Sequence, residues 1–328
     1  MRGNQKGQNM KTTFHKPLSI SSLTPHADSR DRSDSIARRL AQRATTLVEV
    51  LVVTGIVGTL GGLALVGVSK AKEGSKETVA KQEVRGLVEA ILSYQDTYGR
   101  MPASKQANTP SFCGGSPLPF RDYTFGTDAQ DGRGTLKGPN GSRLPSVISQ
   151  TTALIPLDYQ ANNSEVISIL MNLENYRTSG NPQTVNWGHR YNPKGIKFLD
   201  AKESSGLQSP GVGDDLVYRD PWANPYIVTL DLDHNNRSWD NFYAFAHVTE
   251  KPAPDEDSQN GLVGLKRPND APYSAPATAH PSDRHNFVAK ESVMVWSFGP
   301  DGMVDFNVSN SANGKANRGK NKDNLLSW

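Results

Sequence analysis

The feature that most constrains this chain is an apolar run over residues 47–68 in which Glu49 is the only charged residue. At about 1.5 Å of rise per residue, such a run forms a helix of about 33 Å, which is enough for the roughly 30 Å hydrocarbon core of a bilayer. Arg38, Arg39 and Arg43 precede the run, and basic residues are enriched on cytoplasmic flanks. The sequence therefore predicts one membrane span, with the leader inside and the remainder outside.

The helical pattern continues beyond this run. Apolar residues recur at three- and four-residue spacing among Lys, Glu and Gln, which is typical of an amphipathic helix; they are Val79, Val84, Leu87, Val88, Ile91, Leu92 and Tyr94. No proline lies between Ala44 and Arg100. We therefore expect one helix over residues 47–98, roughly 78 Å long, that ends near Gly99 and packs its apolar face on a downstream element.

The remainder of the chain reads as short elements separated by long loops. Residues 1–36 lack an apolar period and are expected to form a disordered leader. Residues 102–140 and 251–286 are expected to be loops, and Asn163 or Ser164 is expected to cap a short helix over 166–171. Aromatic and branched residues predict strands at 226–232, 242–248 and 292–298. The predicted fold class is α+β, with a long helix packed against a small antiparallel sheet.

Composition argues against several classes of protein. The 36 basic and 33 acidic residues nearly balance, with a net charge of +3, which does not indicate a nucleic-acid partner. Cys113 is the only cysteine, so an intramolecular disulfide, a Cys-based zinc site and an iron–sulfur cluster are excluded. The seven histidines never fall at a helical two-ligand spacing, and no hydrolase or nucleotide-binding motif occurs. We expect a protein that is not an enzyme.

The start of the apolar run, Ala44-Thr45-Thr46-Leu47-Val48-Glu49, resembles the processing site of type IV prepilins and type II secretion pseudopilins. That family has a small residue before the cut, usually Gly, and a Glu at the fifth mature position. The resemblance implies cleavage between Ala44 and Thr45 by prepilin peptidase, which makes Glu49 the fifth residue. Ala44 and Thr45 stand where the family usually has Gly and Phe.

The resemblance implies that Glu49 acts in filament assembly. A carboxylate inside an apolar membrane segment costs about 2.5 to 3.5 kcal/mol and normally has a partner. In the family's filaments this partner is the amino terminus of a neighbouring subunit. Gly58 would be the fourteenth mature residue, where the family often has Gly. The alternative is an ordinary signal anchor in which Glu49 lies at the lipid headgroups.

Residues 220–226, Asp220-Pro221-Trp222-Ala223-Asn224-Pro225-Tyr226, resemble the Asp-Pro-Trp-Gly-Asn-Pro-Tyr element of major pseudopilins. Pro221 and Pro225 fix φ in a turn that leads into a strand. Because Ala223 replaces the family's Gly, this position is not expected to need a positive φ. Trp222 and Tyr226 are expected to pack on the long helix.

Two further elements, residues 297–302 and 323–328, resemble the last loop of the same family, where carboxylates and carbonyls hold calcium. Calcium takes six to eight oxygen ligands. The resemblance implies ligation by Asp301 and Asp323, with Asp305 and Asn321 as further candidates. Lys315, Arg318, Lys320 and Lys322 lie in the insertion between the two elements and would oppose a cation. The alternative is a plain turn at Asp301, with Trp328 packed on the sheet and no ion.

Residues 231–236, Asp231-Leu232-Asp233-His234-Asn235-Asn236, begin like an EF-hand loop. Asn236 stands where that loop needs Gly, and Phe242 stands where it needs the closing Glu. The segment is interpreted as a turn after the strand, and a metal site is the less favoured alternative.

The resemblance as a whole implies a type II secretion protein G-like pseudopilin. It divides the chain into a cleaved leader (1–44), a membrane-spanning half-helix (45–68), an amphipathic half-helix (69–100) and a periplasmic head (101–328). Expected partners are copies of the chain, other pseudopilins, prepilin peptidase and the inner-membrane secretion platform. Alternatives are a type IV pilus or minor pilin at the cell surface, a single-span binding protein with a calcium-dependent head and, more remotely, an anchored hydrolase.

Overall fold

The computed structural model describes residues 29–105, 107, 112–113, 116–117, 122–126, 163–206, 209–252, 259–268, 287–304 and 314–328. Two compact units divide the chain, Met1–Gly67 and Val68–Trp328, and each is described by itself. The leader up to residue 28 and most of the predicted loops at 102–140 and 251–286 lie outside the described residues.

The predicted long helix is present and is longer than expected. Helix α1 runs over Ser29–Tyr98, 70 residues. It ends where Gly99, at φ +67°, donates its N–H to the carbonyl of Gln95 at 2.7 Å, since glycine readily takes the left-handed conformation that stops a helix. The expectation of a disordered leader is wrong for residues 29–36, which form the first turns of α1. The absence of Pro and Gly from residues 29–44 explains this extension.

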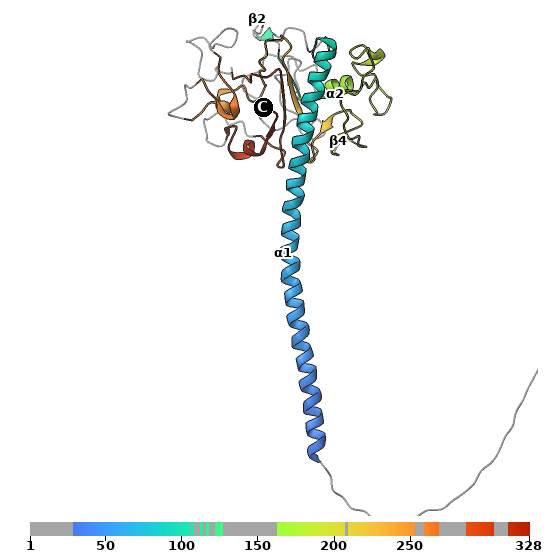
Figure 1. The fold of residues 1–328 in the computed structure, drawn as a ribbon, viewed down its shortest axis with the longest axis vertical. Helices are drawn as coiled ribbons and strands as arrows, with labels where there is room; N and C mark the ends of the chain where they lie inside the picture. The colour runs from blue at the N-terminus through green and yellow to red at the C-terminus, as the bar shows by residue number, and fades with distance from the viewer. Residues whose placement is uncertain are drawn as a thin grey trace, which may run out of the picture. The chain divides into compact units, whose positions relative to one another are not determined.

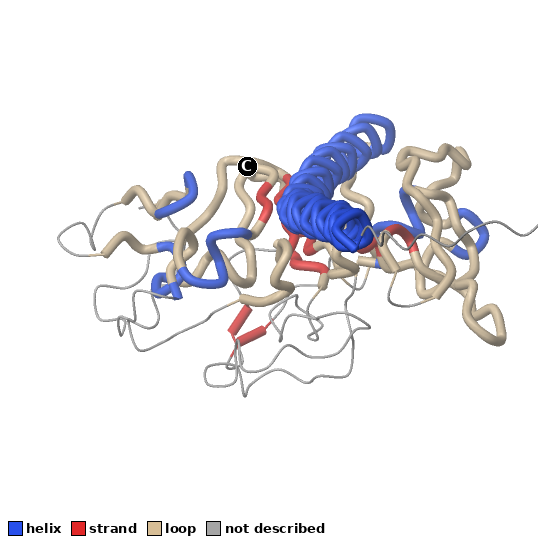
Figure 2. Tube along the Cα trace, turned by 90° about the horizontal axis from the view of Figure 1, so that it is seen from below, coloured by secondary structure: helices blue, strands red, loops and turns tan. Residues whose placement is uncertain are grey.

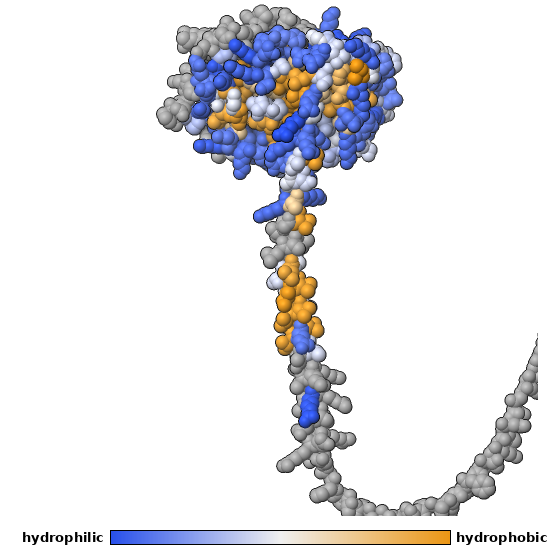
Figure 3. Space-filling model, in the orientation of Figure 1, coloured by the Kyte–Doolittle hydropathy of each residue, from blue (hydrophilic) through white to orange (hydrophobic). Residues whose placement is uncertain are grey.

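The predicted membrane span lies in the first part of α1. No helix in the described part of the chain combines the length and apolar character that crossing a membrane requires. The predicted span at 47–68 includes residues 63–67, whose side chains lie outside the described residues. Before them, the large apolar side chains from Leu47 to Leu60 are 51 to 66% exposed. Figure 3 shows them as a hydrophobic stretch of the helix.

Within Val68–Trp328, a four-stranded antiparallel sheet lies beside the last turns of α1 (Figures 1 and 2). Its strand order is β3 (Tyr123–Phe125), β6 (Ile227–Leu230), β7 (Val293–Ser297) and β8 (Leu325–Leu326). Two small antiparallel pairs complete the described strands: β1 (Phe112–Cys113) with β2 (Ser116–Pro117), and β4 (Gly211–Val212) with β5 (Tyr218–Arg219). The α+β class is therefore confirmed.

Short helices accompany the sheet. They are α2 (Ser164–Leu170), α3 (Ala246–Thr249) and the 3-10 turns η2 (Trp187–His189), η3 (Leu262–Gly264) and η6 (Gly319–Asp323). The predicted helix near 166–171 is thus confirmed, but the Asn163 side chain makes no cap hydrogen bond. Its amide bonds the backbone of Tyr218 and Tyr226 instead, because that backbone lies against the start of α2.

Successive side chains along a strand point to opposite faces of the sheet, and both faces are packed in hydrophobic cores. Val228 and Leu230 of β6 pack in one core with helices α1 and α2. Ile227 of the same strand packs in a second core with Phe242 and Trp296. In α1, the positions buried in the first core are Val84, Leu87, Ala90, Ile91 and Tyr94, whereas Val79 and Leu92 are 41% and 37% exposed. The periodic face predicted for α1 is therefore buried over most of its positions.

Two strand assignments needed correction. The predicted strand at 242–248 is instead a buried turn followed by α3, because the Asp240 carboxylate accepts the N–H groups of Phe242 and Tyr243 at 2.9 and 2.8 Å and starts the turn. Conversely, β1, β2 and β3 all lie in the predicted loop 102–140, and β3 pairs with β6. Three residues are too few to give a clear alternation in a sequence rich in Gly and Pro.

Candidate functional site

The residues predicted for processing and assembly all lie in α1. Ala44 and Thr45 belong to this helix, but their side chains lie outside the described residues. Glu49 is exposed, and an added Cβ at Gly58 would meet nothing within 4 Å. This stretch of helix therefore presents a carboxylate and a small residue among exposed apolar side chains.

Asp220 organises the second predicted motif. It is fully buried, and its Oδ1 accepts the N–H groups of Trp222 and Asn224 at 2.9 and 2.8 Å. The Ser297 hydroxyl donates to its other oxygen. Burial raises the pKa of the Asp220 carboxyl, and these hydrogen bonds act in the opposite direction. One carboxylate thus joins the turn at 220–226 to strand β7.

The aromatic residues of this turn contact α1, as predicted. The indole N–H of Trp222 donates to Glu73 Oε2 at 2.8 Å, and Lys76 Nζ lies 5.9 Å from the centroid of the Trp222 ring. The hydroxyl of Tyr226 donates to Glu83 Oε2 at 2.6 Å. Pro221 and Pro225 flank the turn, and Pro225 forms a bridge with Arg219. The motif therefore fastens the head to the helix with directional bonds.

The bonds of Glu73 with Trp222 and of Glu83 with Tyr226 were not predicted from the sequence. The signal available for Glu83 was its spacing, since it lies four and eight residues before Leu87 and Ile91 on the buried stripe. Burial raises the pKa of Glu83, whereas the hydrogen bond from Trp222 lowers the pKa of Glu73. Burial also raises the pKa of Tyr226, so its hydroxyl stays protonated and remains a donor.

The expectation that residue 223 does not need a positive φ is wrong. Ala223 adopts φ +72°, a left-handed conformation that this position was not expected to need because Ala replaces the family's Gly. The neighbouring N–H groups of Trp222 and Asn224 are both held by Asp220, which forces this geometry on the residue between them. A left-handed conformation costs an alanine roughly 1–2 kcal/mol, so the turn carries local strain.

The two halves of the predicted calcium loop lie close together. Gly299 adopts φ +70°, and a Cβ added there would lie 2.2 Å from the carbonyl oxygen of Asp323. The Asn224 amide donates to the Gly299 carbonyl at 3.0 Å, and a Cβ at Gly302 would lie 2.8 Å from Asn224 Oδ1. The turn at 220–226 therefore also supports the C-terminal loop.

Two side-chain oxygens in this loop suit a cation. Asp323 Oδ1 and Asn324 Oδ1 are both buried and have no hydrogen-bond partner among the described residues. Burial, followed by the charge of Asp301, raises the pKa of the Asp323 carboxyl. Asp301 is exposed, and its Oδ1 accepts the N–H of Met303 at 2.8 Å. Asp301, Asp323 and the unpredicted Asn324 thus offer hard oxygen atoms.

The other predicted calcium residues are placed differently. Asp305 lies outside the described residues. Asn321 is buried, and its amide donates to the carbonyls of Gly314 and Lys315 at 3.0 and 3.3 Å. Its amide nitrogen therefore closes the local loop.

Trp328 packs into the second core. Its ring contacts Tyr243 edge to face, with centroids 5.2 Å apart, and its indole N–H donates to the carbonyl of Val263 at 3.1 Å. This contact agrees with the packing role considered for Trp328, whether or not the nearby loop holds an ion.

A separate acidic group lies at the end of β6. Single carboxylate oxygens of Asp122, Asp231 and Asp233 all lie within 4.8 Å of one another. Burial raises the pKa of Asp231 to about 6. Asp231 Oδ2 accepts the N–H of Asn236 at 2.7 Å, so the predicted turn is confirmed. Asp122 was not recognised because it comes from the segment interpreted as a loop.

Comparison with known proteins gave no match to a family model, to a curated protein or to a solved structure.

The strain at Ala223 predicts that Ala223→Gly stabilises the protein by about 1 kcal/mol, because glycine adopts positive φ without a steric penalty. Thermal or urea unfolding of the full chain measures the change. Ala71→Gly is the matched control, since Ala71 is exposed in α1, where glycine costs roughly 0.5–1 kcal/mol. An Ala223→Gly variant no more stable than the parent would contradict the assigned strain.

The half-buried Glu83 predicts a pH-dependent difference between Glu83→Gln and the parent. In the folded state the pKa of Glu83 is raised above its ordinary value of 4.5. The parent protein therefore loses stability as pH rises through the folded pKa of Glu83, whereas the Glu83→Gln variant has no such titration. Glutamine retains an acceptor for the Tyr226 hydroxyl. The urea midpoint of Glu83→Gln should therefore gain on the parent between pH 4 and pH 8. The exposed Glu89→Gln should show no such trend, and a flat difference for Glu83→Gln would contradict the prediction.

Proposed function

We propose that this chain is a structural subunit of a type II secretion-like pseudopilus. In this proposal prepilin peptidase cuts between Ala44 and Thr45, and α1 assembles with copies of the chain and with other pseudopilins. The subunit is anchored in the inner membrane at the secretion platform, and its head lies in the periplasm. It serves as a scaffold or piston in protein export, without a catalytic role.

The observation that carries the proposal is that the apolar side chains of α1 are exposed in one part of the helix and buried in another. From Leu47 to Leu60 its large apolar side chains are exposed, whereas from Val84 to Tyr94 one face is buried in the head. An exposed apolar stretch of this kind requires a cover of lipid or of other helices. Glu49 lies within this stretch, where a carboxylate needs a positive partner. A newly formed amino terminus on Thr45 of a neighbouring subunit would supply one.

The proposal includes calcium at the C-terminal loop. Asp301 and Asp323 would hold the ion through carboxylate oxygens, and Asn324 would add its amide oxygen. Support comes from the two buried oxygens without partners, Asp323 Oδ1 and Asn324 Oδ1. Bound calcium would offset the repulsion between the two carboxylates and hold Asp323 next to Gly299. Asp305 and Asn321 stay predictions from the sequence.

The same two oxygens favour a second candidate function, a membrane-anchored binding protein with a calcium-dependent head. This candidate needs neither cleavage after Ala44 nor a role for Glu49 in assembly. Processing therefore separates the two candidates.

The pseudopilin proposal predicts a processed and assembling chain. When the full chain is co-expressed with a prepilin peptidase, intact mass and amino-terminal sequencing should find Thr45 as the first residue, with a methylated amine. Glu49→Gln should still be cleaved, but cross-linking should capture several-fold less of the oligomer, because the charge partner of the amino terminus is lost.

Glu77→Gln is the control for assembly, since Glu77 is exposed on the same helix and pairs only locally with Lys81 at 2.6 Å. It should cross-link like the parent. A membrane form that keeps its leader would exclude the pseudopilin proposal, and equal assembly of the Glu49 and Glu77 variants would exclude the role of Glu49.

The calcium assignment predicts that added calcium raises the melting temperature of the full chain. A ligand at a hundredfold excess over its dissociation constant stabilises by about 2.7 kcal/mol. Asp323→Asn should abolish this shift, whereas Asp200→Asn should retain it, because Asp200 is exposed and pairs with Lys197. An equal calcium response in the Asp323 variant would contradict the site.

A further inference from the structure

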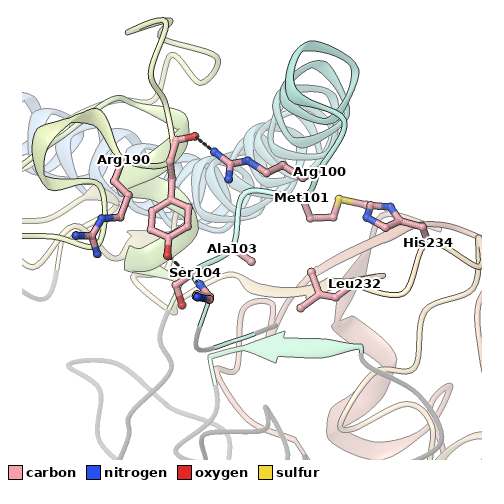
Figure 4. A pocket seen from close by; sticks show the side chains of 9 residues that line it. Arg100, Met101, Ala103, Ser104, Arg190, Leu232 and His234 are labelled. Carbon is pink, nitrogen blue, oxygen red and sulfur yellow. Dashed lines mark hydrogen bonds between the residues drawn. The ribbon is translucent and has the colours of Figure 1, made fainter. Parts of the chain in front are cut away.

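Three segments far apart in the sequence enclose a pocket beyond the end of α1. Residues 100–105 follow the helix, residues 190–191 follow η2, and Leu232 and His234 follow β6. The cavity has a volume of about 370 Å³, within the range of small-molecule sites. Figure 4 shows the side chains that line it.

The floor of the pocket is apolar and firmly packed. Met101, Ala103 and Leu232 line the cavity and are only 4%, 9% and 5% exposed. These side chains belong to the core shared with α1 and α2. An apolar group that enters the cavity would therefore meet a preformed surface and displace water from it.

The rim of the pocket is cationic. Arg100, Lys105 and Arg190 line the cavity together with His234, and no carboxylate is among the described residues that line it. The two guanidinium groups among these side chains attract anions. In Figure 4 the Arg190 guanidinium points away from Met101 and His234, whereas Arg100 directly precedes Met101 in the chain.

Arg100 is held in place before any ligand binds. Its Nη2 donates to the carbonyl of Tyr191 at 3.1 Å, and its guanidinium carbon lies 5.6 Å from the centroid of the Tyr191 ring. Tyr191 is itself fixed, because the backbone N–H of Lys105 donates to its hydroxyl at 2.9 Å and the Tyr94 hydroxyl donates to its carbonyl. A guanidinium has five N–H donors, so Arg100 keeps donors for a carboxylate.

One buried carboxylate beside the pocket, that of Glu165, favours one orientation of an anion. The Glu165 carboxylate is buried and accepts the N–H of Ser104 at 2.6 Å, which places negative charge behind that part of the wall. An anionic group is therefore repelled from the Ser104 end and attracted to the Arg100 end.

We propose that this pocket binds a carboxylate with an apolar body. The carboxylate pairs with Arg100 at the rim, and the apolar body lies on Met101 and Leu232. Such a group could be a free organic acid or the C-terminal carboxylate of a peptide with an apolar last residue. The site is independent of filament assembly and of the calcium loop.

The test measures binding to the full chain by saturation-transfer NMR or calorimetry with 4-phenylbutyrate as the probe. Its neutral amide and acetate are the matched ligands, because each lacks one half of the proposed chemistry. We expect 4-phenylbutyrate to bind saturably and both matched ligands to bind at least tenfold more weakly. N-acetyl-Gly-Phe with a free or an amidated C-terminus distinguishes the sources, since only a peptide site prefers the free peptide to 4-phenylbutyrate.

Arg100→Gln should weaken 4-phenylbutyrate binding about tenfold, the equivalent of roughly 1.4 kcal/mol. Lys197→Gln is the control. Lys197 is an exposed cation close in sequence to Arg190 and Tyr191, but it pairs with Asp200 and does not line the pocket. It should change binding less than twofold. Equal binding of the amide, equal losses in the two variants, or no saturable binding by about 10 mM would each overturn the proposal.

Discussion

The packing of one stripe of α1 against the sheet is the interaction on which the rest of the head depends. Leu87, Ile91 and Tyr94 are fully buried, and they meet Val228 and Val295 from the two central strands. Burying a side chain such as Leu or Ile stabilises a fold by roughly 1.5–3 kcal/mol. The strands are only two to five residues long, and packing against a helix stabilises a sheet this small.

Asp220 connects the segments around the sheet by hydrogen bonds. Its carboxylate takes donors from Trp222, Asn224 and Ser297, so it fixes a turn and a strand at once. The turn then presents Trp222 to α1 and the Asn224 amide to Gly299, next to the carbonyl of Asp323. The strained φ of Ala223 is a consequence of the same carboxylate, because its neighbours cannot both bond Asp220 unless the chain turns sharply between them.

The sequence predicted elements with a long or regular signal and missed those defined by distant partners. The stripe of α1, strands β6 and β7 and the contact of Trp222 with the helix follow from periodicity or a recognisable motif. The turn after Asp240 could not be found in this way, because Phe242 and Tyr243 carry the composition of a strand and only the bonds to Asp240 reveal the turn. The pocket at Arg100 was missed because its walls come from three separate segments, and the one motif among them, at 231–236, was interpreted only as a turn or a metal site.

Directional bonds add what apolar packing alone cannot provide. A stripe of apolar residues fixes which face of α1 meets the sheet, but a slide by one helical turn, about 5.4 Å, would bring a similar stripe into contact. The bond of Tyr226 to Glu83 opposes this slide, because Val79 and Leu87, four residues before and after Glu83, have no side-chain acceptor. The head is therefore tied to a defined point of α1.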